Sequence, residues 1–445
     1  MGTASRAELV RAMEVGIAFS PDDFRAYCAG PNLPHPLSPI SRGFAYSGSF
    51  AGRNIEKIYA LGGQEGSLEA AVRACFGSEG EAAPVRHVLV CSGFYCLHNF
   101  GSFNPGSGAG SCETDGPLGA LALVRAFAAR GVRVSLYCEP HNGPVLRAGY
   151  DAMLRHFERA SPAMAELLRT HSRCLPDATD GAGEPLSPEL ADSLSRMYPG
   201  EPLPLTSSGR SRSVRSALEL RKSVSAAWGP SVPGDIDLLF AIERLSAPYR
   251  NIRGVDISVH TEPIDALWPP AIAPEGSPAV DAMSDFWQAS GVAADPTALR
   301  ELAGVSPNAL SIGIGDGGNE VGMGKVSVQP AVAVLSPGGE FAQISVNGAY
   351  RACDHLIVGT VSNWAGTAFE AAAHVLVPPA AALDYVSYDD SVEKTILDAI
   401  TAAPAGSVDG KYPAQQNSVD GMTWEPHHRE YYEFIWDMAK KVQNV

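Results

Sequence analysis

The stretch from residue 311 to residue 328, SIGIGDGGNEVGMGKVSV, combines six glycines with Asp316, Asn319, Glu320 and Lys325. Glycine lacks a Cβ atom, so the backbone of such a loop can approach a bound molecule closely. Carboxylates in the loop can hold a hard cation or move a proton, and a lysine can offset the charge of an acidic ligand. Asp, Asn and Gly are also common turn residues, so a turn without chemistry is the competing interpretation.

Further polar residues stand where apolar runs end or helices begin. The segment CETDGPLG contains Thr114, Asp115 and Gly116, Glu243 closes the apolar run 236–245, and SNW follows the run that begins at residue 355. In open α/β sheets, ligands bind beyond the carboxyl ends of the strands. We therefore expect these residues and the glycine-rich loop to meet at one rim of a sheet.

The elements that would position these residues alternate between strands and helices. Apolar runs predict strands at 86–94, 132–139, 236–245, 255–260, 310–315, 332–336 and 355–362. Helical patterns run from Pro117 to Gly131 and over 213–227, 279–290, 296–303, 365–374, 391–402 and 426–442. This alternation predicts an α/β fold with a mainly parallel sheet flanked by helices in Rossmann-like layers.

The chain divides by composition into two parts. Residues 1–85 are expected to form a mostly helical N-terminal extension packed on the main domain, and residues 86–445 to form the α/β catalytic domain. Within the latter, residues from about 172 to 235 are rich in Pro, Ser, Gly and Arg. Such a composition is typical of a low-complexity, flexible insertion.

Charge and cysteine usage narrow the class of protein. The net charge of −16, from 33 basic and 49 acidic residues, argues against non-specific nucleic-acid binding. No apolar run has membrane-spanning length, and the eight cysteines form no C-x-x-C pair. We expect a small-molecule partner, no nucleic acid and no membrane, and a homo-oligomer is left open. The expected location is cytoplasmic, with mitochondrial as the alternative.

A dinucleotide site is the first chemical alternative. Gly313, Gly315 and Gly318 make a literal G-x-G-x-x-G pattern. A dinucleotide fingerprint opens directly into a helix, whereas here the chain continues with NEVGMGKV, where two more glycines weaken a helix. No nucleotide cofactor is therefore expected.

Four segments carry a family resemblance. ETDGPLGAL, FAIERLSAPYRNIRG, IGDGGNEVGMGKV and VGTVSNWAGTAFEAAAHVL, in this order, resemble the D-glutamate cyclase family, in particular the C-terminal cyclase-type domain of its animal member. The similarity covers roughly residues 55 to 440 apart from the insertion. It implies a hydro-lyase of D-amino acid metabolism that cyclises D-glutamate to 5-oxo-D-proline (pyroglutamate), with loss of water and without ATP.

Such a cyclisation sets chemical demands that the candidate residues can meet. A base must deprotonate the α-ammonium group, an acid must protonate the leaving oxygen, and the charge of the γ-carboxylate must be offset. The predicted catalytic residues are Asp316, Glu320, Glu243 and Lys325, with Lys325 expected to neutralise a substrate carboxylate. A divalent metal, Mn or Mg, is expected on Asp316, Glu320 and Asp115. The predicted substrate-binding residues are Thr114, Asp115, Gly116, Gly317, Gly318, Asn319, Ser362 and Asn363.

Two other functions fit the same residues. One is a Mg-dependent enzyme that handles phosphates or nucleotides, since glycine loops and carboxylates serve that chemistry too. The other is a non-catalytic amino-acid-binding protein that has kept the site but not the reaction.

Overall fold

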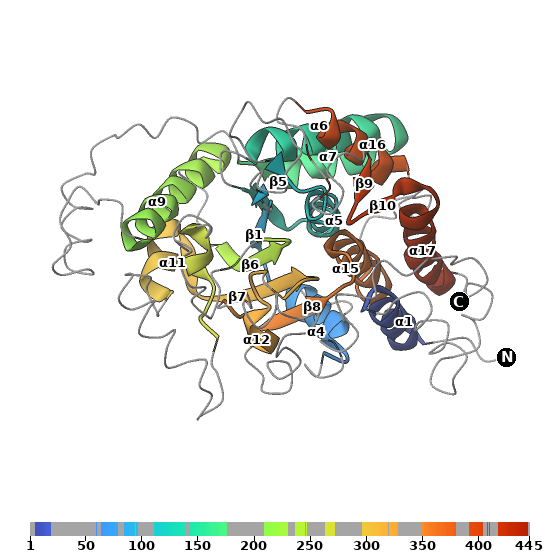
Figure 1. Ribbon diagram of the computed structural model, residues 1–445, viewed down its shortest axis with the longest axis horizontal. Coiled ribbons are helices and arrows are strands. Elements are labelled where there is room, and N and C mark those ends of the chain that lie inside the picture. Colours follow the sequence, from blue (N-terminus) through green and yellow to red (C-terminus); the bar gives the residue numbers. More distant parts are fainter. Residues whose placement is uncertain are drawn as a thin grey trace.

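A computed structural model of the 445-residue chain shows the arrangement of its secondary structure (Figure 1). The structure describes residues 5–18, 59, 64–78, 84–93, 95–96, 111–138, 142–175, 209–229, 236–244, 246, 263–271, 296–318, 320–327, 349, 351–379, 391–403, 407, 409 and 417–443. The strands predicted at 255–260 and 332–336, the helix predicted at 279–290 and Asn319 lie outside these residues.

A six-stranded parallel sheet forms the centre of the described structure. Its spatial order is β5-β4-β1-β6-β7-β8, which is 3-2-1-4-5-6 when these six strands are counted along the chain. In this doubly wound order the switch point, where ligands usually bind, lies between β1 and β6. The strands are β1 (His87–Ser92), β4 (Arg133–Tyr137), β5 (Ser172–Cys174), β6 (Ile236–Ile242), β7 (Val305–Gly315) and β8 (His355–Val358).

Helices cover both faces of the sheet, because its strands are apolar on both sides. Val88 and Val90 of β1 pack into one core, whereas the alternating Leu89 and Cys91 pack into the other. Figure 1 shows α9 and α11 on one side of the sheet, and α5 and α15 on the other. The first core includes α1 (Arg6–Ala18), α4 (Ser67–Phe76), α5 (Pro117–Ala128), α6 (Gly143–Ala160), α7 (Pro162–His171), α15 (Ser362–Leu376), α16 (Ser391–Thr401) and α17 (Arg429–Gln443). The second includes α9 (Gly209–Trp228), the 3₁₀ helix η4 (Pro263–Leu267), α11 (Thr297–Ala303) and the short α12 (Gly324–Ser327).

Two short hairpins and one further turn complete the described elements. They are β2 (Tyr95–Cys96) with β3 (Ser111–Cys112), β9 (Ser418–Val419) with β10 (Met422–Thr423), and η6 (Trp424–His428). No helix among the described residues is long and apolar enough to cross a bilayer.

These elements confirm the predicted fold class and refine several boundaries. The apolar run at 355–362 yields a strand only to Val358, because α15 begins at Ser362. The helix predicted near 213–227 is α9. The edge strand β5 was not predicted, since Ser-Arg-Cys is too short and too polar to signal a strand. The start of the region assigned to an insertion thus belongs to the sheet, while residues 176–208 and 230–235 lie outside the described part.

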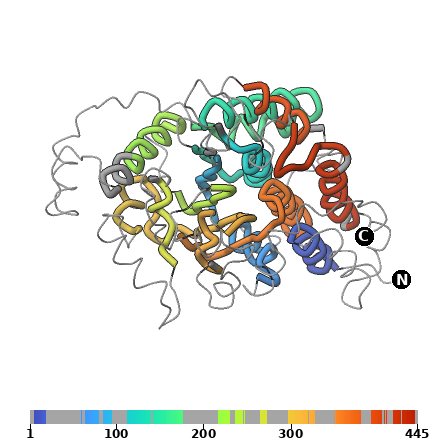
Figure 2. Tube along the Cα trace, viewed as in Figure 1, coloured from blue at the N-terminus to red at the C-terminus, as the bar shows by residue number. Residues whose placement is uncertain are grey.

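The two ends of the chain pack on the same side of the sheet. In Figure 2, α1 (blue) and α17 (red) lie side by side, and both contact α15. Glu14 of α1 is buried and accepts hydrogen bonds from the Tyr59 hydroxyl (2.6 Å) and the Gly66 N–H (2.9 Å). The backbone N–H of Thr360, just beyond β8, donates to the carbonyl of Ile17. Helices α1 and α4 are therefore part of the core that supports α15.

Helices α5 and α15 approach each other so closely that their backbones touch. A Cβ atom added at Gly366 would lie 2.6 Å from both Cα and the carbonyl oxygen of Gly119. Backbone cannot move aside as a side chain can, so the contact requires glycine. We expect Gly366→Ala to lower the free energy of unfolding by about 2–3 kcal/mol or to prevent folding, measured by urea denaturation.

Gly149→Ala on α6 provides the matched control. Both changes add one methyl group inside a helix, with the same gain in helix propensity. At Gly149, however, the nearest atom is a methyl of the Ile400 side chain at 2.9 Å, which can rotate away. Equal stability of the two variants would contradict the backbone contact.

A buried histidine links the C-terminal segment to α15. The indole N–H of Trp364 donates to Nδ1 of His428 (2.9 Å), and Nε2 of His428 lies 3.2 Å from the carbonyl of Val419. Burial lowers the pKa of His428 to about 4. Between pH 6.5 and 4 the unfolded chain therefore binds a proton that the folded protein excludes, so stability falls as the pH drops through this window.

The expected slope is about 1 kcal/mol per pH unit from His428 alone. Urea denaturation at pH 7, 6 and 5 measures it, with His428→Gln as the comparison because glutamine can accept from Trp364 and does not titrate. A slope unchanged in His428→Gln would show that this histidine is not responsible.

Candidate active site

Three carboxylates meet at the carboxyl ends of the strands. Oxygens of Asp115, Glu243 and Asp316 all lie within 4.8 Å of one another, and the three residues are at most 4% exposed. Glu243 directly follows β6 and Asp316 directly follows β7, while Asp115 directly precedes the turn into α5. This position beside the switch point is where the doubly wound order predicts a ligand. We call these three residues the acidic cluster.

Asp115 is held as an anion by backbone donors. Its Oδ1 accepts the N–H groups of Asn363 (2.8 Å) and Gly116 (3.0 Å), and its Oδ2 accepts the N–H of Ser362 (2.9 Å). Ser362 and Asn363 open α15, so the carboxylate also faces the positive end of that helix. Three donors and a helix N-terminus stabilise the charged form of Asp115.

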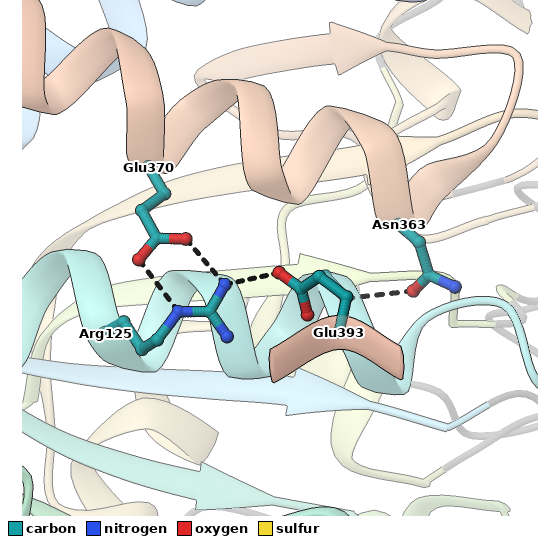
Figure 3. A network of polar contacts seen from close by, with 5 residues as sticks. Arg125, Asn363, Glu370 and Glu393 are labelled. Atoms are coloured by element: carbon teal, nitrogen blue, oxygen red, sulfur yellow. Dashed lines mark hydrogen bonds and ion pairs between the residues drawn. The ribbon is translucent and has the colours of Figure 1, made fainter. Parts of the chain in front are cut away.

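Asn363 caps the start of α5 in the same way that Asp115 caps the start of α15. Its side-chain Oδ1 accepts the N–H groups of Gly116 and Gly119, both at 2.9 Å, and its Nδ2 donates to the Thr114 carbonyl (3.0 Å). Figure 3 shows Asn363 at the start of α15, with its carbonyl oxygen directed at α5. Asn363 therefore fixes the backbone on both sides of Asp115.

The surroundings of Glu243 favour its neutral form, in contrast to those of Asp115. Burial comes first among the causes that raise its pKa well above the usual value, followed by the charges of Glu320, Asp115 and Glu113. The Ser362 hydroxyl, which donates to Oε2 at 2.6 Å, opposes this shift. Glu243 also has a positive φ of 42°, a conformation that costs free energy in a residue with a side chain. Strain of this kind is concentrated at functional sites.

Two buried arginines form ion pairs with carboxylates outside the acidic cluster. Arg244, next to Glu243 in the chain, pairs with Asp265 at 2.6 Å. Arg125 of α5 lies between Glu370 of α15 and Glu393 of α16, at 2.7 and 2.5 Å (Figure 3). The latter triad fastens α16 to the helix pair.

The glycine-rich loop is organised by Glu320. The N–H groups of Gly317 and Gly318 each donate to one oxygen of the Glu320 carboxylate, both at 2.9 Å. Gly318 (92°) and Gly322 (101°) of the loop have positive φ, a conformation that glycine adopts without strain. Glu320 is buried and its charge acts on Glu243, but the close group of three oxygens consists of Asp115, Glu243 and Asp316.

Two other predicted residues lie away from the acidic cluster or only at its edge. Lys325 is exposed, and its ammonium group donates to the carbonyl of Asp354, which precedes β8 at the other end of the strands. Thr114 donates its hydroxyl to the Ser418 carbonyl at 2.8 Å, tying the β9–β10 hairpin to the loop before α5.

Two further residues of the site were not among the sequence candidates. Glu113 is buried, and its charge raises the pKa of Glu243. Ser92 ends β1 at the switch point, and its buried hydroxyl has no hydrogen-bond partner among the described residues. Their signals in the sequence were weak, since one acid in CETDGP and one serine after an apolar run are common in loops.

The donor set fits a divalent cation of the hard type. It consists of carboxylate oxygens alone, which suit Mg²⁺ or Mn²⁺ better than zinc. Three buried acids cannot all remain charged at this separation without a cation or a proton among them. Burial and the neighbouring acids raise the pKa of Glu243, which favours its protonated form.

A family model described as "D-glutamate cyclase-like, C-terminal" matches residues 49–277 and 293–434. The chain belongs to the D-glutamate cyclase-like family. The two matched ranges contain all six strands of the sheet and every member of the acidic cluster, while α1 precedes them. No curated protein matches the chain. Membership in the D-glutamate cyclase-like family therefore comes from the part of the chain that builds the sheet and its carboxyl-end rim.

Proposed function

We propose that this protein is a D-glutamate cyclase, a hydro-lyase that converts D-glutamate to 5-oxo-D-proline and water without ATP. The observation that carries the proposal is the acidic cluster at the switch point of the sheet, in a chain of the D-glutamate cyclase-like family. In the reaction the α-nitrogen forms a bond to the γ-carbon, and one γ-oxygen leaves as water.

In this proposal Glu243 and Asp316 carry out different proton transfers. Glu243, whose pKa is raised, is the acid that delivers a proton to the γ-oxygen that leaves. Asp316, the neighbouring carboxylate after β7, accepts a proton from the α-ammonium group, which frees the nitrogen to attack. The second proton that the nitrogen loses passes to the same γ-oxygen, which has then gained two protons and leaves as water. The Ser362 hydroxyl holds Glu243 in place through Oε2.

The remaining groups bind and orient. The hydroxyl of Ser92, which has no hydrogen-bond partner among the described residues, lies at the same rim and could donate to a substrate carboxylate. Asp115, fixed by three N–H groups, would hold a divalent cation together with Asp316, and Glu243 would be the third oxygen donor once it has given up its proton. Such a cation would offset the negative charge that the substrate carboxylates bring to the cluster.

The test is to incubate the protein with D-glutamate or L-glutamate, with and without Mn²⁺, and to follow loss of one water by NMR and mass spectrometry. The proposal expects 5-oxo-D-proline from the D-enantiomer and none with Glu243→Gln. Tight binding of D-glutamate without product would instead favour an amino-acid-binding protein. A rise in melting temperature with nucleotides, but none with D-glutamate, would favour a Mg-dependent phosphate-handling enzyme.

A further inference from the structure

A basic pocket lies at the opposite end of the sheet from the acidic cluster. It has a volume of about 500 Å³, within the range of small-molecule sites. Its lining comes from the segments that precede β1 and β4 and from the ends of α7 and α9. These are the amino ends of the strands, so the pocket is separate from the carboxyl-end rim.

The pocket wall is unusually positive for a chain with a net charge of −16. Arg86, Arg130, Arg133 and His171 line it, together with the indole of Trp228. No Asp or Glu is among the described residues that line it. Several positive side chains around one concave surface focus the potential and attract anions.

The alternative explanation is that the arginines only satisfy helix carboxyl ends. It accounts for Arg130, whose guanidinium donates to the carbonyls of Ala126 (2.7 Å) and Val377 (2.8 Å). It does not account for Arg133, which is half-buried and whose guanidinium has no hydrogen-bond or ion-pair partner among the described residues. Arg86 is mostly exposed, and its guanidinium makes a long contact of 3.4 Å with Asp237.

These arrangements give the pocket one fixed and two available guanidinium groups. Arg130 is held by two carbonyls and lies over the Phe76 ring, so its charge is already in position. Arg133 and Arg86 retain free N–H groups that match carboxylate or phosphate oxygens in pairs. His171 adds an imidazole that an anion would help to protonate.

We propose that the basic pocket is a second ligand site, which binds a small polyanion through its carboxylate or phosphate oxygens. It is independent of the reaction at the acidic cluster and does not rest on the cyclase proposal. Arg86 and Arg133 contact the anion, and Arg130 supplies a fixed positive charge behind it.

Isothermal titration calorimetry of the full chain tests this site. The probes are pyrophosphate and succinate at a constant 0.15 M KCl, about the ionic strength at which weak surface attraction is screened. We expect saturable binding of at least one probe, and the better one identifies the oxygens as phosphate or carboxylate. Arg133→Gln should raise its dissociation constant about tenfold or more, the scale of losing a charged hydrogen-bonding partner.

Two variants make the result specific. Arg155→Gln removes the same charge from an exposed position of α6 outside the pocket and should leave the dissociation constant unchanged. Arg86→Gln, at an exposed position, should weaken binding even if Arg133→Gln does not fold. Absence of binding of both probes, or equal weakening in the Arg155 and pocket variants, would overturn the proposal. D-glutamate binding at the acidic cluster should be the same in all three variants.

Discussion

Replacing Glu243 by glutamine is expected to lower the rate of D-glutamate cyclisation by about 10²-fold or more and to raise thermal stability. Glutamine keeps the shape of the side chain and can still accept the hydrogen bond from Ser362. It cannot deliver a proton to the leaving oxygen, and general acid catalysis is worth about 10²- to 10⁴-fold in rate. Stability should rise because the change removes a buried acid from beside three other carboxylates.

The gain in stability should depend on pH with a defined sign. The pKa of Glu243 in the folded protein lies above its value in the unfolded chain, so the folded protein binds more protons above pH 4.5. Wild-type stability therefore falls as the pH rises through this region, and the stability of the Glu243→Gln variant should fall less. Chemical denaturation at pH 5 and pH 8, combined with turnover per folded molecule, measures both effects.

Glu14→Gln serves as the control for this pair of measurements. Glu14 is also buried with a raised pKa, but it lies on α1 and bonds to Tyr59 and Gly66. Its substitution should change stability and leave turnover per folded molecule intact. If Glu243→Gln turned over D-glutamate at the wild-type rate, the hypothesis that Glu243 transfers a proton would be refuted.

Asp316→Asn and Glu320→Gln should differ, although both acids stand in the same glycine-rich loop. Asp316 contributes an oxygen to the acidic cluster. Its change to Asn should lower the cyclisation rate by about 10²-fold or more, the scale of losing a base or a charge partner. It should also weaken Mn²⁺ binding and change the melting temperature little.

Glu320→Gln acts first on the loop itself. Both carboxylate oxygens accept N–H groups of the loop, and the NH₂ group of glutamine cannot accept one of them. One buried N–H would lose its partner, which costs about 1–3 kcal/mol, so the melting temperature should fall. Calorimetry and Mn²⁺ titration on both variants separate the roles. A stable Glu320→Gln with weakened Mn²⁺ binding would instead place Glu320 among the metal ligands, as the sequence suggested.

Local patterns in the sequence were sufficient for most of the fold. The apolar runs that became β1, β4, β6 and β7 alternate with helical patterns, and a strand that is buried on both faces must be apolar throughout. The edge strand β5 was not predicted because its three residues, at the margin of the sheet, show no such pattern. The family resemblance rested on the long motif GDGGNE-x-GMG and on its order along the chain with TDGP and SNW.

The sequence by itself placed acids after strands, and only the tertiary structure decided which of them meet. Asp115 and Asn363 are 248 positions apart and bind each other because α5 and α15 touch through glycine. Lys325 stands nine residues after Asp316, yet the chain turns back and carries its ammonium group to Asp354. Glu243 owes its raised pKa first to burial and then to acids from two other segments of the chain. Such distances depend on helix packing and on the return path of loops, which local residue patterns do not encode.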